Sequence, residues 1–79
     1  MSYFGSVDKK SIVYILDNGL DFLKDELKEP SRTADQNKSD FYRLEKLLYG
    51  EGKSLLSTTN KVRFEKRLNT IRKKMDTWE

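Results

Sequence analysis

Apolar residues recur at helical spacing over the first long segment of the chain, residues 8–29. Five of them fall on one face of a helix: Ile12, Leu16, Leu20, Leu23 and Leu27. Asp8 can cap the N-terminus of this helix. Pro30 ends it, because proline cannot continue the helical hydrogen bonds and disfavours helical geometry at the preceding residue. The spacing therefore predicts a helix over residues 8–29.

The same segment contains a competing signal for extended structure. Residues 12–16 form a β-branched and aromatic run, and the turn-forming sequence Asp17-Asn18-Gly19 follows it. A strand over this run, or a kink at Gly19, is the alternative to a continuous helix. A strand could pair only with residues 2–7, and an isolated two-stranded hairpin is marginally stable. The continuous helix is therefore favoured, with an irregular or extended N-terminus before it.

Two further helices are predicted after a polar connection. Residues 30–38 contain one small apolar residue and several turn formers, which indicates an exposed loop. The second helix is expected over residues 39–49, with Ser39 as its cap and Gly50 as its end. After a flexible joint at residues 50–52, the last helix is expected over residues 58–76. The residues of its regular apolar stripe are Phe64, Leu68, Ile71, Met75 and Trp78.

These elements predict a single all-α domain over residues 1–79. Its expected architecture is a small three-helix bundle, made of a helical hairpin plus a long C-terminal helix. A chain of 79 residues can enclose only one modest core, which leaves little room for a large closed pocket. The longest apolar run, residues 12–16, is too short to cross a bilayer, and no signal pattern precedes it. No membrane association is expected.

The residue types needed for most catalytic sites are missing from the chain. Cysteine is absent, which removes disulfides and reactive thiols and favours a reducing, cytoplasmic setting. Histidine is absent as well, so the usual general bases and metal ligands cannot be assembled. We therefore expect a protein that is not an enzyme, with no catalytic residues, no cofactor and no metal.

One motif suggests phosphate binding and fails on its own pattern. Residues 50–54 end in the Gly-Lys-Ser sequence of phosphate-binding loops. The complete pattern requires a further glycine at the position that Leu47 occupies, and it follows a strand, whereas Leu47 lies in a predicted helix. The segment is better interpreted as a joint between helices.

Basic residues gather in the C-terminal half of the chain. Residues 1–40 carry six basic and eight acidic side chains, whereas residues 41–79 carry ten basic and five acidic ones. The basic surface expected on the last helix consists of Lys61, Arg63, Lys66, Arg67, Arg72, Lys73 and Lys74. At about 3.6 residues per turn these side chains spread around the helix. A helix that reads a nucleic-acid groove normally concentrates them on one face, so the spread weakens that interpretation.

Acidic residues form a row on the first helix, where Asp17, Asp21 and Asp25 recur every four residues along the expected exposed face. Such a row is usually solvated surface. Its functional alternative is an acidic stripe that meets a basic surface, either on the protein's own last helix or on a partner.

Aromatic residues are more numerous than three short helices can bury. Phe41 and Phe64 are expected in the core. The aromatic residues predicted to bind a partner are Tyr3, Phe4, Phe22, Tyr42 and Trp78. Exposed aromatics beside arginine and lysine are typical of protein-binding hot spots. A homodimer interface would use them equally well.

The favoured hypothesis is a small helical adaptor or regulator, of the size often used to inhibit or retarget a larger machine. It would bind and modulate a larger protein through its aromatic anchors and its basic C-terminal helix. The alternative is a nucleic-acid-binding protein in which residues 60–75 contact phosphates.

Overall fold

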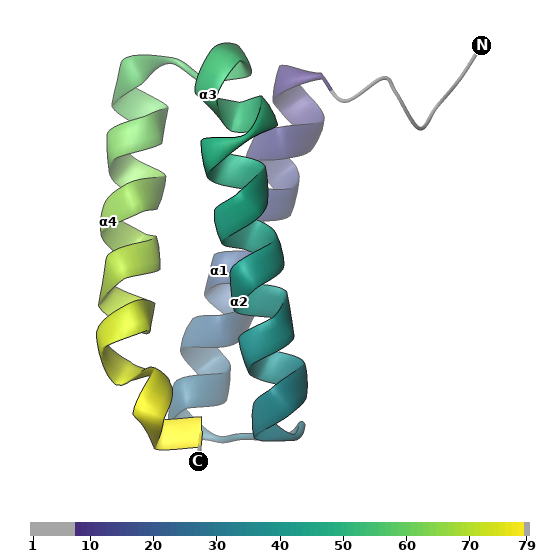
Figure 1. The fold of residues 1–79 in the computed structure, drawn as a ribbon, viewed down its shortest axis with the longest axis vertical. Coiled ribbons are helices and arrows are strands. Elements are labelled where there is room, and N and C mark those ends of the chain that lie inside the picture. The colour runs from purple at the N-terminus through teal and green to yellow at the C-terminus, as the bar shows by residue number, and fades with distance from the viewer. Residues whose placement is uncertain (1–7, 79) are drawn as a thin grey trace, which may run out of the picture.

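The computed structural model describes residues 8–78, which fold into four helices and a final 3-10 turn. The elements are α1 (Lys9–Lys28), α2 (Ala34–Tyr49), α3 (Glu51–Leu55), α4 (Thr58–Lys74) and η1 (Met75–Trp78). Helices α1 and α4 run in one direction and α2 runs antiparallel to both, with the short α3 at the end where α2 gives way to α4 (Figure 1). No strand occurs within residues 8–78, and the predicted all-α three-helix bundle is confirmed. None of these helices combines the length and apolar character needed to cross a membrane.

Helix α1 is continuous through Gly19. The carboxylate of Asp8 caps it by accepting a hydrogen bond from the Ser11 backbone N–H at 2.8 Å. Gly19 faces α2, where a Cβ atom would lie only 2.8 Å from the Cδ2 atom of Leu44. The glycine therefore serves a close approach between two helices, and the turn signal around it has no structural effect.

Helix α2 begins five residues earlier than the sequence pattern indicates. Thr33, rather than Ser39, is the N-cap, and its side chain forms a reciprocal capping box with Gln36. The segment predicted as an exposed loop over residues 30–38 is consequently helical from Ala34, and Asn37 within it is fully buried. Only residues 29–33 connect the two helices.

The predicted joint at residues 50–52 is partly helical. Gly50 ends α2 by donating its backbone N–H to the Lys46 carbonyl oxygen, and α3 begins at the next residue. Gly52 is buried, and a Cβ there would meet Leu56 and the Leu47 carbonyl oxygen at 3.1 Å. This close packing brings Leu56 into the core, after which Ser57 caps α4.

The core lies between the three long helices and extends to the C-terminal turn. Its buried apolar residues are Ile12, Leu16, Leu20, Leu23, Phe41, Leu44, Leu48, Leu56, Phe64, Leu68, Ile71, Met75 and Trp78. Trp78 is only 5% exposed, and its indole N–H donates to the Glu26 carbonyl oxygen at 3.0 Å. Trp78, which the sequence pattern placed among the candidate partner anchors, is therefore part of the core. The tight turn of η1 extends the apolar stripe of α4 and closes the base of the bundle.

Candidate functional site

Two arginines of the predicted basic surface hold α4 against the rest of the bundle. Arg67 lies between two carboxylates of α1, with nitrogen-to-oxygen distances of 2.7 Å to Asp17 and 2.6 Å to Asp21. Arg72 forms an ion pair with Glu45 of α2. Part of the acidic row on α1 thus meets the protein's own last helix. These arginines are engaged within the fold, which reduces the charge that α4 can offer to a partner.

The other predicted basic residues differ in their surroundings. Lys61 donates a hydrogen bond to the Lys53 carbonyl oxygen. Arg63, Lys66, Lys73 and Lys74 are exposed, and none of them forms an ion pair with any residue in 8–78. At about 100° per residue, these four fall within about a third of the helix circumference. The charge that remains exposed on α4 is therefore more concentrated than the sequence indicates.

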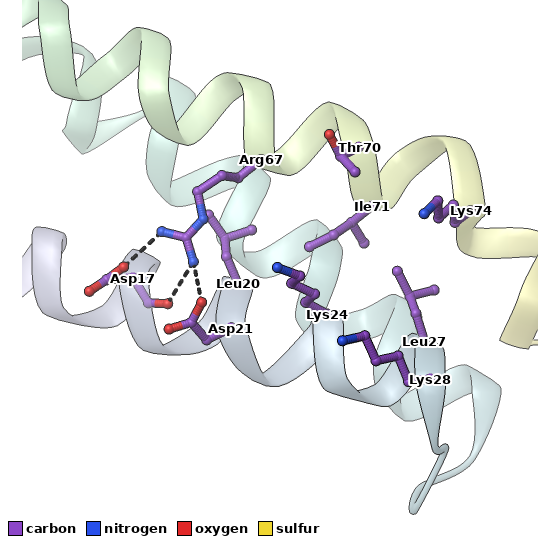
Figure 2. Close-up of a pocket in the computed structure, with 10 residues that line it drawn as sticks. All are labelled: Asp17, Leu20, Asp21, Lys24, Leu27, Lys28, Arg67, Thr70, Ile71 and Lys74. Carbon is purple, nitrogen blue, oxygen red and sulfur yellow. Dashed lines mark hydrogen bonds and ion pairs between the residues drawn. The ribbon is translucent and has the colours of Figure 1, made fainter.

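A groove of about 390 Å³ runs between α1 and α4. Its apolar floor is formed by Leu20, Leu27 and Ile71, and the pairing of Arg67 with α1 closes one end (Figure 2). The other end is rimmed by Lys24 and Lys28 of α1 and by Lys74 of α4. Figure 2 shows the side chains of Lys24 and Lys28 in the space between the two helices, with Lys74 facing them from α4. This half of the groove combines an apolar floor with a positively charged rim.

A second, shallower groove of about 180 Å³ lies on the other flank of α1, against α2. Ile15 and Phe22 form its apolar wall, and Gly19 and Leu44 line it between them. Ile15 also lines the neighbouring hollow with Tyr14, which makes the exposed apolar surface continuous. We call Tyr14, Ile15 and Phe22 the α1 apolar face. These side chains are 69%, 45% and 41% exposed, respectively.

Polar residues surround the α1 apolar face. Asp40 and Arg43 of α2 line the far side of its groove. The guanidinium of Arg32 lies 4.6 Å from the centroid of the Phe22 ring, a cation-π distance that holds the ring against the bundle. An apolar centre within a polar rim is the usual composition of a protein-binding surface.

The predicted aromatic anchors do not form one surface. Phe22 belongs to the α1 apolar face. Tyr42 is 56% exposed but packs edge-on against Phe41, and it does not line the α1–α2 groove. Tyr3 and Phe4 lie outside the described residues. Tyr14 and Ile15 were missed by the sequence analysis, although the five-residue apolar run at residues 12–16 is wider than a single helical stripe requires.

A buried polar cluster fastens the connection between α1 and α2. The Glu26 carboxylate accepts hydrogen bonds from the Ser31 hydroxyl, from the backbone N–H groups of Ser31 and Arg32, and from the Asn37 amide. Foremost through the bonds from Ser31, these donors lower the pKa of Glu26 to about 2. Arg32 in turn donates to Asn37 and pairs with Asp40 at 2.6 Å.

The buried polar groups of this cluster are all hydrogen-bonded within the protein, so none of them is left unpaired. Every buried side-chain nitrogen or oxygen atom in the described part of the chain has a hydrogen-bond partner. A carboxylate held in its charged form by several donors is a poor general acid, because it takes up a proton only near pH 2. No group of acidic side chains within residues 8–78 is arranged to hold a metal ion. Glu26 therefore has a structural role.

No family model, curated protein or solved structure matches the chain.

Proposed function

We propose that the protein is a small non-enzymatic helical adaptor that binds a larger protein through the α1 apolar face. The observation that supports this proposal is that Ile15 shares one hollow with Tyr14 and the next with Phe22, which links three exposed large apolar side chains on a chain in which 37% of residues are charged. Apolar residues scattered singly over a surface need no explanation, whereas a continuous group within a polar rim is typical of an interface.

The composition of the face fits the energetics of protein recognition. Tyr14 and Phe22 are aromatic, and aromatic residues dominate binding hot spots because each buries a large area at a small entropic cost. Gly19 adds no side chain between Ile15 and Phe22, so a partner can approach the helix backbone there. The three side chains cover two turns of one helix, so a partner can contact them together.

The test is affinity capture from extract of the cells that make the protein. We compare the native chain with the double variant Ile15→Ser/Phe22→Ser and with the control Val62→Ser. Val62 is 42% exposed on α4 and is not part of the α1 apolar face. Val62→Ser should change the free energy of unfolding by less than about 0.5 kcal/mol. The double variant should cost more, because Phe22 loses its contact with Arg32, and circular dichroism checks that it remains folded.

The proposal expects one protein to be captured by the native chain and by Val62→Ser, and to be lost with the double variant. Equal capture by all three chains would overturn it. Light scattering on the purified protein tests the homodimer in the same samples. A native dimer that becomes a monomer only in the double variant would assign the face to self-association instead.

The second candidate function is nucleic-acid binding. It is favoured by the exposed basic side chains of α4. Arg63, Lys66, Lys73 and Lys74 share one part of the helix circumference. Contacts to phosphates release counterions, so binding to duplex or single-stranded nucleic acid should weaken steeply with added salt. Replacing Lys66, Lys73 and Lys74 by alanine should then abolish it. Absence of binding at low salt would remove this candidate.

A further inference from the structure

We propose that the lysine-rimmed half of the α1–α4 groove is a separate docking site for an acidic amphipathic helix of a partner protein. The site consists of the floor residues Leu20, Leu27 and Ile71 and of the rim residues Lys24, Lys28 and Lys74. It lies on the flank of α1 opposite the α1 apolar face. The inference therefore shares with the proposed function only the premise that the protein is a binding module, and it stands on different residues.

The lysine end of the groove carries positive charge that no acidic side chain lining the groove balances. Its two acidic residues, Asp17 and Asp21, are both bonded to Arg67 at the other end. None of the three rim lysines forms an ion pair with a residue in 8–78. Three ammonium groups around one groove repel each other, and carboxylates placed among them would relieve that repulsion. The complementary ligand is an anion with several charges.

The floor of the groove requires that the ligand also be apolar. Leu20 and Ile71 are core residues with 1% and 3% exposure, and Leu27 packs partly buried beside them. Because Leu20 and Ile71 are already almost fully buried, the apolar surface that a ligand can still cover belongs mainly to Leu27 and to the aliphatic stems of the rim lysines. Covering that surface excludes water from it, which gives a gain that charge alone does not supply.

The geometry of the rim suits a helix as the ligand. Lys24 and Lys28 are one turn apart on α1, and Lys74 faces them from α4 (Figure 2). Because α1 and α4 run side by side in the same direction, a third helix can lie along the groove between them (Figure 1). Such a helix would place its apolar stripe on the floor and acidic residues beside the lysines. The result resembles the packing of a four-helix bundle.

Nucleic acid fits this half of the groove less well than an acidic helix does. A phosphate backbone would pair with the lysines, but it has no apolar stripe to cover Leu27 and the aliphatic stems of the lysines. The two ligands therefore differ in whether the apolar floor contributes to binding, which an experiment can measure.

The test is fluorescence anisotropy with the whole protein and four labelled probes. The first probe is an amphipathic helical peptide of about 18 residues, long enough to follow most of α1 at about 1.5 Å per residue, with leucine on one face and glutamate on its flanks. The second carries lysine in place of glutamate. The third is polyglutamate of equal charge, and the fourth is a short DNA duplex. Titrations are made at about 50 mM and about 200 mM salt. The comparison shows how much of the affinity depends on contacts between charges, which salt weakens by screening.

The proposal expects saturable binding of the acidic amphipathic peptide, with no binding of its lysine counterpart and at least about tenfold weaker binding of polyglutamate. The variant Lys24→Glu/Lys28→Glu should lower the affinity for the acidic peptide by at least about tenfold. The control Lys66→Glu/Lys73→Glu makes the same change of charge outside the groove and should change affinity by less than about threefold. Far-UV circular dichroism confirms that both variants remain folded.

Three results would overturn the proposal. They are failure of the acidic peptide to bind, equal binding of polyglutamate or duplex DNA, and equal losses in the groove variant and the control. Equal binding of DNA would assign the lysines to a general surface for polyanions. The Ile15→Ser/Phe22→Ser variant should bind the peptide normally. It therefore distinguishes failure of this site from failure of the α1 apolar face.

Discussion

Trp78 holds the C-terminal turn against the base of the bundle, and its replacement by alanine should destabilise the protein strongly. The indole is 5% exposed and belongs to the core. Burial of about 200 Å² of indole surface, at about 25 cal/mol per Å², stabilises the fold by about 5 kcal/mol. Alanine keeps part of that burial, and a terminal turn can relax without leaving a cavity, so we expect a loss of about 3 kcal/mol. A domain of this length has about 4–12 kcal/mol of total stability.

The measurement is urea denaturation followed by far-UV circular dichroism, because Trp78 is the only tryptophan and the variant lacks the fluorescent probe. In the native protein its emission should be blue-shifted and should move to the red on unfolding. Trp78→Phe keeps an aromatic ring but loses the hydrogen bond to the Glu26 carbonyl oxygen, which costs about 1 kcal/mol. The control is Thr77→Ala, an exposed position in the same turn, which should change stability by less than about 0.5 kcal/mol.

A loss below about 1 kcal/mol in Trp78→Ala, or a loss equal to that of Thr77→Ala, would refute this reasoning. The indole would then be exposed in solution, and its assignment to the core would fail. Trp78 would return to the set of candidate partner anchors.

Three further predictions concern α1, α2 and the connection between them. The Glu26 pKa of about 2 lies below its ordinary value of 4.5, so the stabilisation is complete above about pH 4.5 and is lost as pH falls toward 2. The stability difference between the native protein and Glu26→Gln should accordingly shrink from pH 7 to pH 3 in urea titrations, and a constant difference would contradict the role of the charge. Thr33→Ala removes the cap of α2 and should cost about 1 kcal/mol by urea denaturation, whereas a neutral effect would argue against the early start of that helix. Gly19→Ala gains up to about 1 kcal/mol of helix propensity but places a Cβ 2.8 Å from Leu44, so we expect net destabilisation. In a Leu44→Ala background the same change should stabilise, and a double-mutant cycle without coupling would disprove the contact.

The helices that have a regular apolar stripe could be predicted from the sequence, and the start of α2 could not. The stripes of α1 and α4 mark core positions, so their spacing predicts which faces of the helices pack together. The first turns of α2 face the core with Asn37, whose amide is bonded to Glu26 of α1. A pattern of apolar residues does not detect a buried pair of polar residues. The remaining local signal was the capping box from Thr33 to Gln36.

The residues of the candidate surfaces could be predicted only in part. Phe22 and Lys74 follow from residue type, whereas Tyr14, Ile15 and the two lysines of α1 do not. Arg67 and the two aspartates it contacts lie about fifty residues apart in sequence, and nothing local indicates that they meet. This contact pairs the charge of Arg67 within the fold, so the arginine adds less to the exposed charge of α4. It also closes one end of the α1–α4 groove. The burial of Trp78 likewise depends on the position of the Glu26 carbonyl oxygen in another helix.

Helix α1 is more apolar than the bundle requires. One stripe, from Ile12 to Leu27, packs against α2 and α4, and this stripe is sufficient to hold the helix in place. Tyr14, Ile15 and Phe22 lie outside it and remain 41–69% exposed. On the opposite flank, Leu27 and the rim lysines leave an apolar groove open to a charged ligand. The floor of the groove belongs to the core, whereas Tyr14, Ile15 and the rim lysines lie outside it. The two proposals assign both surfaces to binding. On these proposals, their positions on two flanks of one helix would let two partners, or two parts of one partner, bind at once.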